Sequence, residues 1–113
     1  MMAWYLVAAK PNCERLDELC ERLGKDEFRR LRPFGNALTD SLRNARRRPG
    51  GFAVWEEEDY CSPPLAEERA AVLDAYFDRL SVAPVPHREG WRKIASLPPL
   101  FPEFARSQET QHG

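Results

Sequence analysis

The chain has 113 residues, of which 42% are hydrophobic and 31% charged, and its net charge is −1. This composition is typical of one globular domain large enough to bury a core, and the balanced charge excludes a general attraction to nucleic acid or anionic lipid. The longest apolar runs are far shorter than the roughly 20 residues that cross a bilayer. Because the sequence also lacks a signal peptide and a CxxC pair, we expect a cytoplasmic protein.

The first two elements are a strand and a helix. Residues Ala3–Ala9 are apolar and aromatic and end at a Lys-Pro-Asn turn, which predicts a largely buried strand. Asn12 is a suitable N-cap for the helix that follows, and Gly24 marks its end. The apolar stripe of this helix consists of Leu16, Leu19 and Leu23.

Residues Phe28–Phe34 alternate between apolar and basic side chains, which predicts a second strand, and Pro33 places it near an edge. The next segment has apolar residues at helical spacing and ends at Pro49-Gly50-Gly51, so we expect an extra helical segment there. Its apolar positions are Leu38, Leu42 and Ala45.

The third predicted strand is Phe52–Glu58. A long amphipathic helix follows, with apolar residues from Leu65 to Leu80. Ser62 has the extended preference of a residue before proline and offers an N-cap hydroxyl, so we expect the helix to begin there, with two prolines in its first turn. Residues Ser81–Val85 predict a short last strand. A proline-rich arm over residues 86–104 and a disordered tail over 105–113 complete the chain.

This order of elements predicts a ferredoxin-like α+β fold, βαββαβ, in a single domain over residues 1–104. It has an antiparallel four-stranded sheet with the helices on one face and the extra helical segment between strands 2 and 3. The other face has no predicted cover. It would therefore be polar, bind a small apolar ligand, or pair with a second subunit, in the last case as a dimeric α/β barrel.

Three residues are candidates for catalysis by residue type: Tyr60, Cys61 and His87. A helix N-terminus lowers the pKa of a thiol, but the four acids Glu56–Asp59 disfavour a thiolate at Cys61. His87 suits acid–base chemistry near neutral pH, yet nothing in the sequence brings it near the other two. We therefore leave catalysis open and favour a protein that is not an enzyme.

No cofactor or metal is expected from the motifs. The sequence has no GxGxxG, P-loop or HExxH motif, and the acidic run lacks the glycine and spaced oxygen ligands of a calcium loop. On a strand, alternate residues face opposite ways, so Glu56 and Glu58 share one face and Glu57 points to the other.

Opposed charges and an apolar arm predict protein contacts. A basic cluster precedes the glycine turn, the acids follow the third strand, and the C-terminal arm carries large apolar side chains. Arginine forks suit carboxylates and protein interfaces. The candidate partner-binding residues are Arg43, Arg46, Arg47, Arg48, Glu56, Glu58, Leu100 and Phe101.

A nucleic-acid alternative rests on "GGFAVWEE", Gly50 to Glu57. It resembles the third strand of RNA-recognition motif domains at Gly51, Phe52 and Ala53, and Tyr5 would be a second base-stacking platform. The pattern departs where Val54 replaces an aromatic residue, so binding of single-stranded RNA is the less favoured alternative.

The first strand, Trp4 to Ala9, resembles the opening strand of the small accessory factors of the aerobic cyclase in chlorophyll synthesis. Those factors are also short single-domain α+β proteins. The resemblance implies an accessory role and transfers no functional residue. Our leading hypothesis is a small binding or accessory protein that acts through protein contacts, as a homodimer. The alternative is a dimeric α/β-barrel enzyme of the isomerase, cyclase or monooxygenase type.

Overall fold

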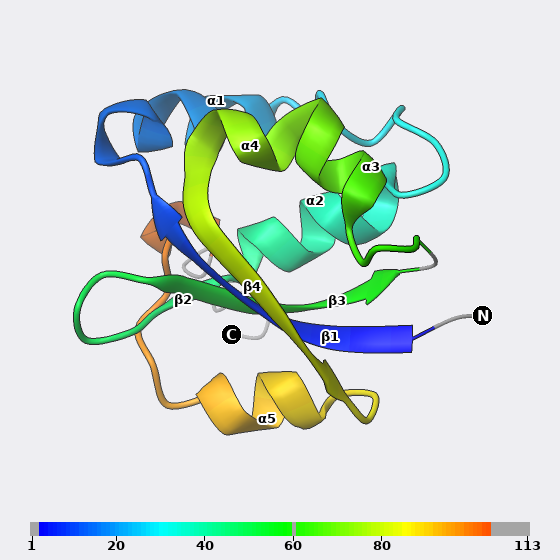
Figure 1. The fold of residues 1–113 in the computed structure, drawn as a ribbon. Helices are drawn as coiled ribbons and strands as arrows, with labels where there is room; N and C mark the ends of the chain where they lie inside the picture. The colour runs from blue at the N-terminus through cyan, green and yellow to red at the C-terminus, as the bar shows by residue number, and fades with distance from the viewer. Residues whose placement is uncertain (1–2, 60, 105–113) are drawn as a thin grey trace, which may run out of the picture.

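The computed structural model describes residues 3–59 and 61–104. Its centre is a four-stranded antiparallel sheet in the order β2-β3-β1-β4 (Figure 1). The α+β class and the antiparallel sheet are therefore confirmed, and the arrangement is compatible with a ferredoxin-like fold. The strands are β1 (Ala3–Pro11), β2 (Arg46–Arg47), β3 (Ala53–Asp59) and β4 (Phe77–Val85).

The helices lie on both sides of this sheet. In Figure 1, α1, α2, α3 and α4 lie above the sheet and α5 lies below it. The prediction that the helices cover only one face is thus wrong, because the C-terminal region supplies α5 to the other face. The helical elements are a 3-10 turn (Cys13–Arg15), α1 (Leu16–Gly24), α2 (Gly35–Arg43), α3 (Ala66–Glu68), a π-helical stretch (Arg69–Leu73), α4 (Asp74–Tyr76) and α5 (Glu89–Ile94).

The chain folds as predicted from Ala3 to Gly24, as a strand followed by a helix. The side chain of Asn12 accepts a hydrogen bond from the backbone N–H of Glu14, as expected for an N-cap. Leu19 and Leu23 are fully buried on the face of α1 that meets the core.

The predicted second strand over residues 28–34 is wrong, because this segment consists of turns. Local bonds satisfy its backbone: the N–H of Leu31 bonds the carbonyl of Phe28, and that of Gly35 bonds Leu31. The segment therefore needs no strand partner. The observed second strand is β2, which lies inside the region predicted to be helical. The extra helix α2 therefore precedes the second strand, whereas the sequence pattern predicts that it follows that strand.

The long helix also differs from the prediction at both ends. It runs continuously over residues 66–76 and begins at Ala66, not at Ser62. The carboxylate of Asp59 accepts hydrogen bonds from the backbone N–H groups of Cys61 (3.1 Å) and Leu65 (2.5 Å), so it organises the turn before the helix. The helix ends early because Phe77 starts β4, which pairs with β1 from Trp4 to Pro11 with one register shift.

The main core lies between the sheet and the upper helices. It includes Val7, Trp55, Leu38 and Leu73, each fully buried. No helix among residues 3–59 and 61–104 is both long and apolar enough to cross a membrane.

The C-terminal arm packs on its own domain. Leu100 and Phe101 are each only 4% exposed, and the N–H of Leu100 bonds the carbonyl of Ala45 at 2.8 Å. Arg46 forms a β-bridge with Pro99. These two apolar residues, predicted for partner binding, thus close the core and are not on the surface. The predicted tail at 105–113 lies outside the described residues.

Candidate functional site

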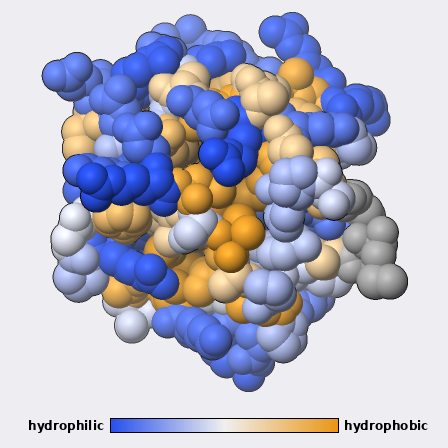
Figure 2. Space-filling view, in the orientation of Figure 1, coloured by the Kyte–Doolittle hydropathy of each residue, from blue (hydrophilic) through white to orange (hydrophobic). Residues whose placement is uncertain are grey.

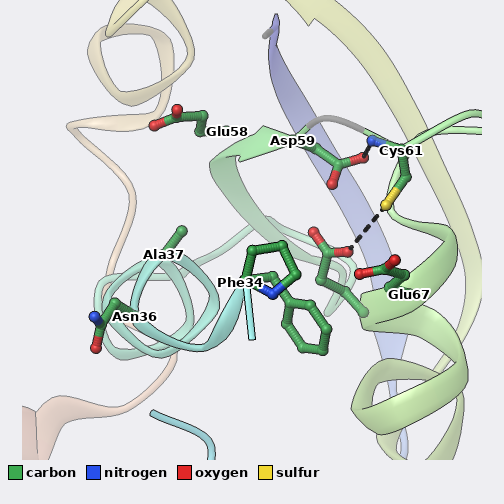
Figure 3. Close-up of a pocket in the computed structure, with 9 residues that line it drawn as sticks. Phe34, Asn36, Ala37, Glu58, Asp59, Cys61 and Glu67 are labelled. Atoms are coloured by element: carbon green, nitrogen blue, oxygen red, sulfur yellow. Dashed lines mark hydrogen bonds between the residues drawn. The ribbon is translucent and has the colours of Figure 1, made fainter. Parts of the chain in front are cut away.

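A pocket of about 360 Å³ lies where β3 ends and α3 begins (Figure 3). The start of α2 forms its opposite wall. Acidic groups and one thiol come from the β3–α3 side, and apolar atoms come mainly from the segment before α2. The lining residues are Pro33, Phe34, Asn36, Ala37, Glu58, Asp59, Cys61, Glu67 and Glu68.

The alternation of β3 sends its acids to opposite faces. Glu56, only 3% exposed, turns toward α5. Its carboxylate accepts the backbone N–H groups of Arg88 (2.9 Å), Gly90 (2.8 Å) and Trp91 (3.4 Å). Three donors at the start of a helix satisfy this carboxylate. Glu56, a predicted partner-binding residue, is therefore occupied inside the molecule, where it holds α5 against the sheet.

Glu57 points to the main core and meets Glu68 there. The two side chains are 1% and 0% exposed. The indole N–H of Trp55 donates to Oε1 of Glu57 at 2.9 Å, but Oε2 of each glutamate has no hydrogen-bond partner among the described residues. Burying two ionised carboxylates that lack hydrogen-bond partners costs desolvation free energy, unless the pair carries a proton or binds a cation.

Burial sets the protonation of this pair. Desolvation raises the pKa of Glu57 well above its ordinary value, against a smaller lowering by the hydrogen bond from Trp55. Desolvation, followed by the hydrogen bond with Asp59, raises the pKa of Glu68 to about 7. The pair therefore holds a proton at pH values where an exposed glutamate would be ionised.

Cys61 lies next to this pair. Its thiol is 3.9 Å from Oε1 of Glu68. The Cys61 sulfur, one carboxylate oxygen of Asp59 and one of Glu68 all lie within 4.8 Å of one another. The backbone N–H of Glu67 acts to lower the pKa of Cys61, but burial and the neighbouring carboxylates together raise it. This environment is unfavourable for a free nucleophilic thiolate.

The other catalytic candidates do not join this cluster. His87 is exposed, its ring centroid lies 4.3 Å from that of Trp4, and it lines a different pocket, with Arg88 and Glu56. Tyr60 lies outside the described residues. Among residues 3–59 and 61–104, the structure thus brings Cys61 together with carboxylates and with no histidine.

The predicted basic cluster is divided between internal and exposed positions. Arg43 donates to the carbonyl of Leu23 at 2.7 Å and to Asp26 at 2.9 Å, and Arg46 donates to the carbonyl of Leu97 at 2.9 Å. These two arginines fasten neighbouring segments of the same chain. The exposed residues of the cluster are Arg47 and Arg48, and Glu58 is half-buried at the pocket wall.

Sequence reasoning missed Glu57 and Glu68 as functional residues. A signal was present in both cases. Glu57 lies two residues after Trp55, on the buried face of the strand. Glu68 lies three residues after Leu65 and four before Val72, so it falls on the apolar face of the helix. Acids in core positions are rare unless paired, which makes them informative.

Searches for matching protein-family models, curated proteins and solved structures found no match to this chain.

Proposed function

We propose that this chain is a small binding protein that acts through protein–protein contact, with β4 as its contact strand. The observation that carries the proposal is the position of β4, a nine-residue strand at the edge of the sheet. An edge strand presents unpaired backbone groups, which are a template for pairing with another strand.

The side chains of β4 support this role. Leu80 and Val82 are half-buried and pack partly against the main core, Val85 is half-buried, and Ala83 is exposed. β4 crosses the middle of the face shown in Figure 1, and Figure 2 shows hydrophobic residues gathered in the middle of the same face, with hydrophilic ones around them. An apolar centre with a polar rim is the usual composition of a protein interface.

The occupant that fits best is a second copy of the chain. Antiparallel pairing of β4 with its symmetry mate about Ser81 would place Leu80 opposite Val82 twice, which satisfies two-fold symmetry with apolar cross-strand pairs. Arg79, with a φ of 54°, and Pro84 limit the paired stretch to the residues between them. A net charge of −1 opposes such pairing only weakly.

The two alternatives find less support. A dimeric barrel would pack the lower face of the sheet against a second sheet, but α5 lies on that face and Glu56 holds it there. For RNA binding, Tyr5 would need to be an open platform, yet it packs against the main core. Val54, at the second platform position, is fully buried.

Light scattering across a concentration series tests the proposal, with the chain mass of 13.0 kDa as the monomer reference. We expect the wild-type protein to approach twice this mass. Ser81→Glu puts two carboxylates directly opposite each other at the two-fold axis of the paired strands and should weaken the dimer at least about tenfold. The matched control is Ser96→Glu, another exposed serine, located after α5. A monomer at every concentration, or a dimer equally insensitive to both substitutions, would refute pairing through β4.

The accessory role has its own test. Affinity purification from the native host should recover a stable protein partner with the wild-type chain and lose it with Ser81→Glu. Repeated recovery of the chain alone would contradict an accessory role.

A further inference from the structure

We propose that Asp59, Cys61 and Glu68 form a binding site for a divalent cation that accepts thiolate ligands, such as Zn²⁺. The site is independent of the contact strand β4. It uses residues from two elements, since Asp59 ends β3 and Glu68 ends α3, with Cys61 in the connection between them.

The distances fit a single ion after small movements. Zinc binds sulfur at about 2.3 Å and carboxylate oxygen at about 2.0 Å, so a tetrahedral site separates these two ligand atoms by roughly 3.5 Å. Sγ of Cys61 and Oε1 of Glu68 are 3.9 Å apart, and the three ligand atoms lie within 4.8 Å of one another. The dashed line in Figure 3 joins this thiol to the carboxylate of Glu68, with Asp59 facing them.

A second observation points to a ligand. Glu68 is fully buried, and its Oε2 has no hydrogen-bond partner among residues 3–59 and 61–104; the same holds for Oε2 of the neighbouring Glu57. Native proteins rarely leave such atoms unsatisfied, because the desolvation cost is not recovered. A cation bound by Asp59, Cys61 and Glu68 would replace the proton that the buried pair otherwise holds and convert the thiol to a bound thiolate.

The donor set selects the class of ion. Calcium takes six to eight oxygen ligands, and magnesium prefers an octahedron of oxygens with several waters, so neither matches a site with a sulfur donor. Two carboxylates and a thiolate suit zinc and related metals. Three protein ligands leave a fourth position, which would face the pocket lined by Phe34, Asn36 and Glu67 and be filled by water or an entering ligand.

Titration of the full chain with Co²⁺, a spectroscopic substitute for Zn²⁺, tests the site. We expect one equivalent to bind with the absorption of thiolate-to-cobalt charge transfer and of tetrahedral cobalt, and Zn²⁺ to displace it. Cys61→Ser should remove the charge-transfer band and weaken binding at least about tenfold.

A matched control is available in the same chain. Cys20 donates to the carboxylate of Glu103 at 2.8 Å, which is a second thiol–carboxylate pair. Cys20→Ser should leave the cobalt spectrum unchanged. Absence of the charge-transfer band in the wild type, or its loss in Cys20→Ser but not in Cys61→Ser, would overturn the proposal.

A second variant keeps the test independent of thiol chemistry. Glu68→Gln removes one ligand and one buried charge, so the metal-free variant should fold at least as stably as the wild type. Zn²⁺ should raise the melting temperature of the wild type but not of Glu68→Gln. An equal increase in both proteins would show that Glu68 is not a ligand and would contradict the site.

Discussion

Three consecutive glutamates on β3 occupy three different environments. Glu56 caps α5 through three backbone donors, Glu57 is buried against Trp55, and Glu58 is half-buried at a pocket wall. The alternation of a strand was enough to predict that Glu57 faces away from its neighbours. It was not enough to predict burial, because the cover of the two faces comes from other elements, α3 on one face and α5 on the other.

The buried carboxyl pair predicts how stability depends on pH in the metal-free protein. Burial raises the pKa of Glu68 to about 7 and that of Glu57 well above its ordinary value, with Asp59 and Cys61 facing them. Between the ordinary value of 4.5 and about 7, the folded state holds a proton that the unfolded chain has released. The free energy of unfolding should therefore fall as pH rises through this window, by about 1–3 kcal/mol.

Urea unfolding with a chelator, from about pH 5 to about pH 8, measures this dependence. Glu68→Gln should flatten it, because the amide does not titrate. Glu67→Gln, at the exposed neighbouring position, should retain it. Identical pH profiles for the wild type and Glu68→Gln would show that the pair does not carry the effect.

At the scale of elements, local patterns predicted β1, α1 and β3, because each has a clear period and an end signal in its own residues. The region 28–34 has the alternation of a strand but folds as turns. Its apolar Phe28 enters the core from a turn, and the strand position next to β3 is taken by β2. The start of the long helix was missed because its turn is organised by Asp59, a residue of the preceding strand.

Gly35 shows how closely the turn segment meets α2. A Cβ at this position would lie 2.3 Å from the carbonyl oxygen of Phe28 and 2.7 Å from that of Arg29, both backbone atoms. Gly35→Ala should therefore lower the free energy of unfolding by about 2 kcal/mol or more, since the backbone must move. Gly24→Ala, where a Cβ meets nothing within 4 Å, should change it by less than about 1 kcal/mol. Chemical denaturation of both variants checks this, and similar values for the two would contradict the close approach.

At the scale of the whole molecule, the C-terminal arm completes the core. Its prolines and apolar residues were equally consistent with a partner-binding arm, because a sequence does not show which surface such an arm covers. Its contacts with β2 and Ala45 settle that it covers its own domain. In the candidate site, sequence reasoning identified Cys61 and the neighbouring acids but not Glu68, because the contact of Glu68 with Cys61 depends on how the turn after β3 folds.

Phe101→Ala tests this structural role. Removing a buried phenylalanine side chain should cost about 3–5 kcal/mol and lower the melting temperature clearly. Lys93→Ala, at an exposed position of α5, is the control and should have little effect. Calorimetry compares the two, and an unchanged melting temperature for Phe101→Ala would show that the arm is dispensable for the fold.

The register of β1 on β3 affects how the protein should be tagged. Ala3 pairs with Asp59, so a tag joined to Met1 would start two residues from the strand position beside a proposed zinc ligand. A hexahistidine tag at that end would bring imidazoles next to the acidic cluster and supply ligands of its own. Metal titrations therefore require a tag that is cleaved or placed at the other end of the chain.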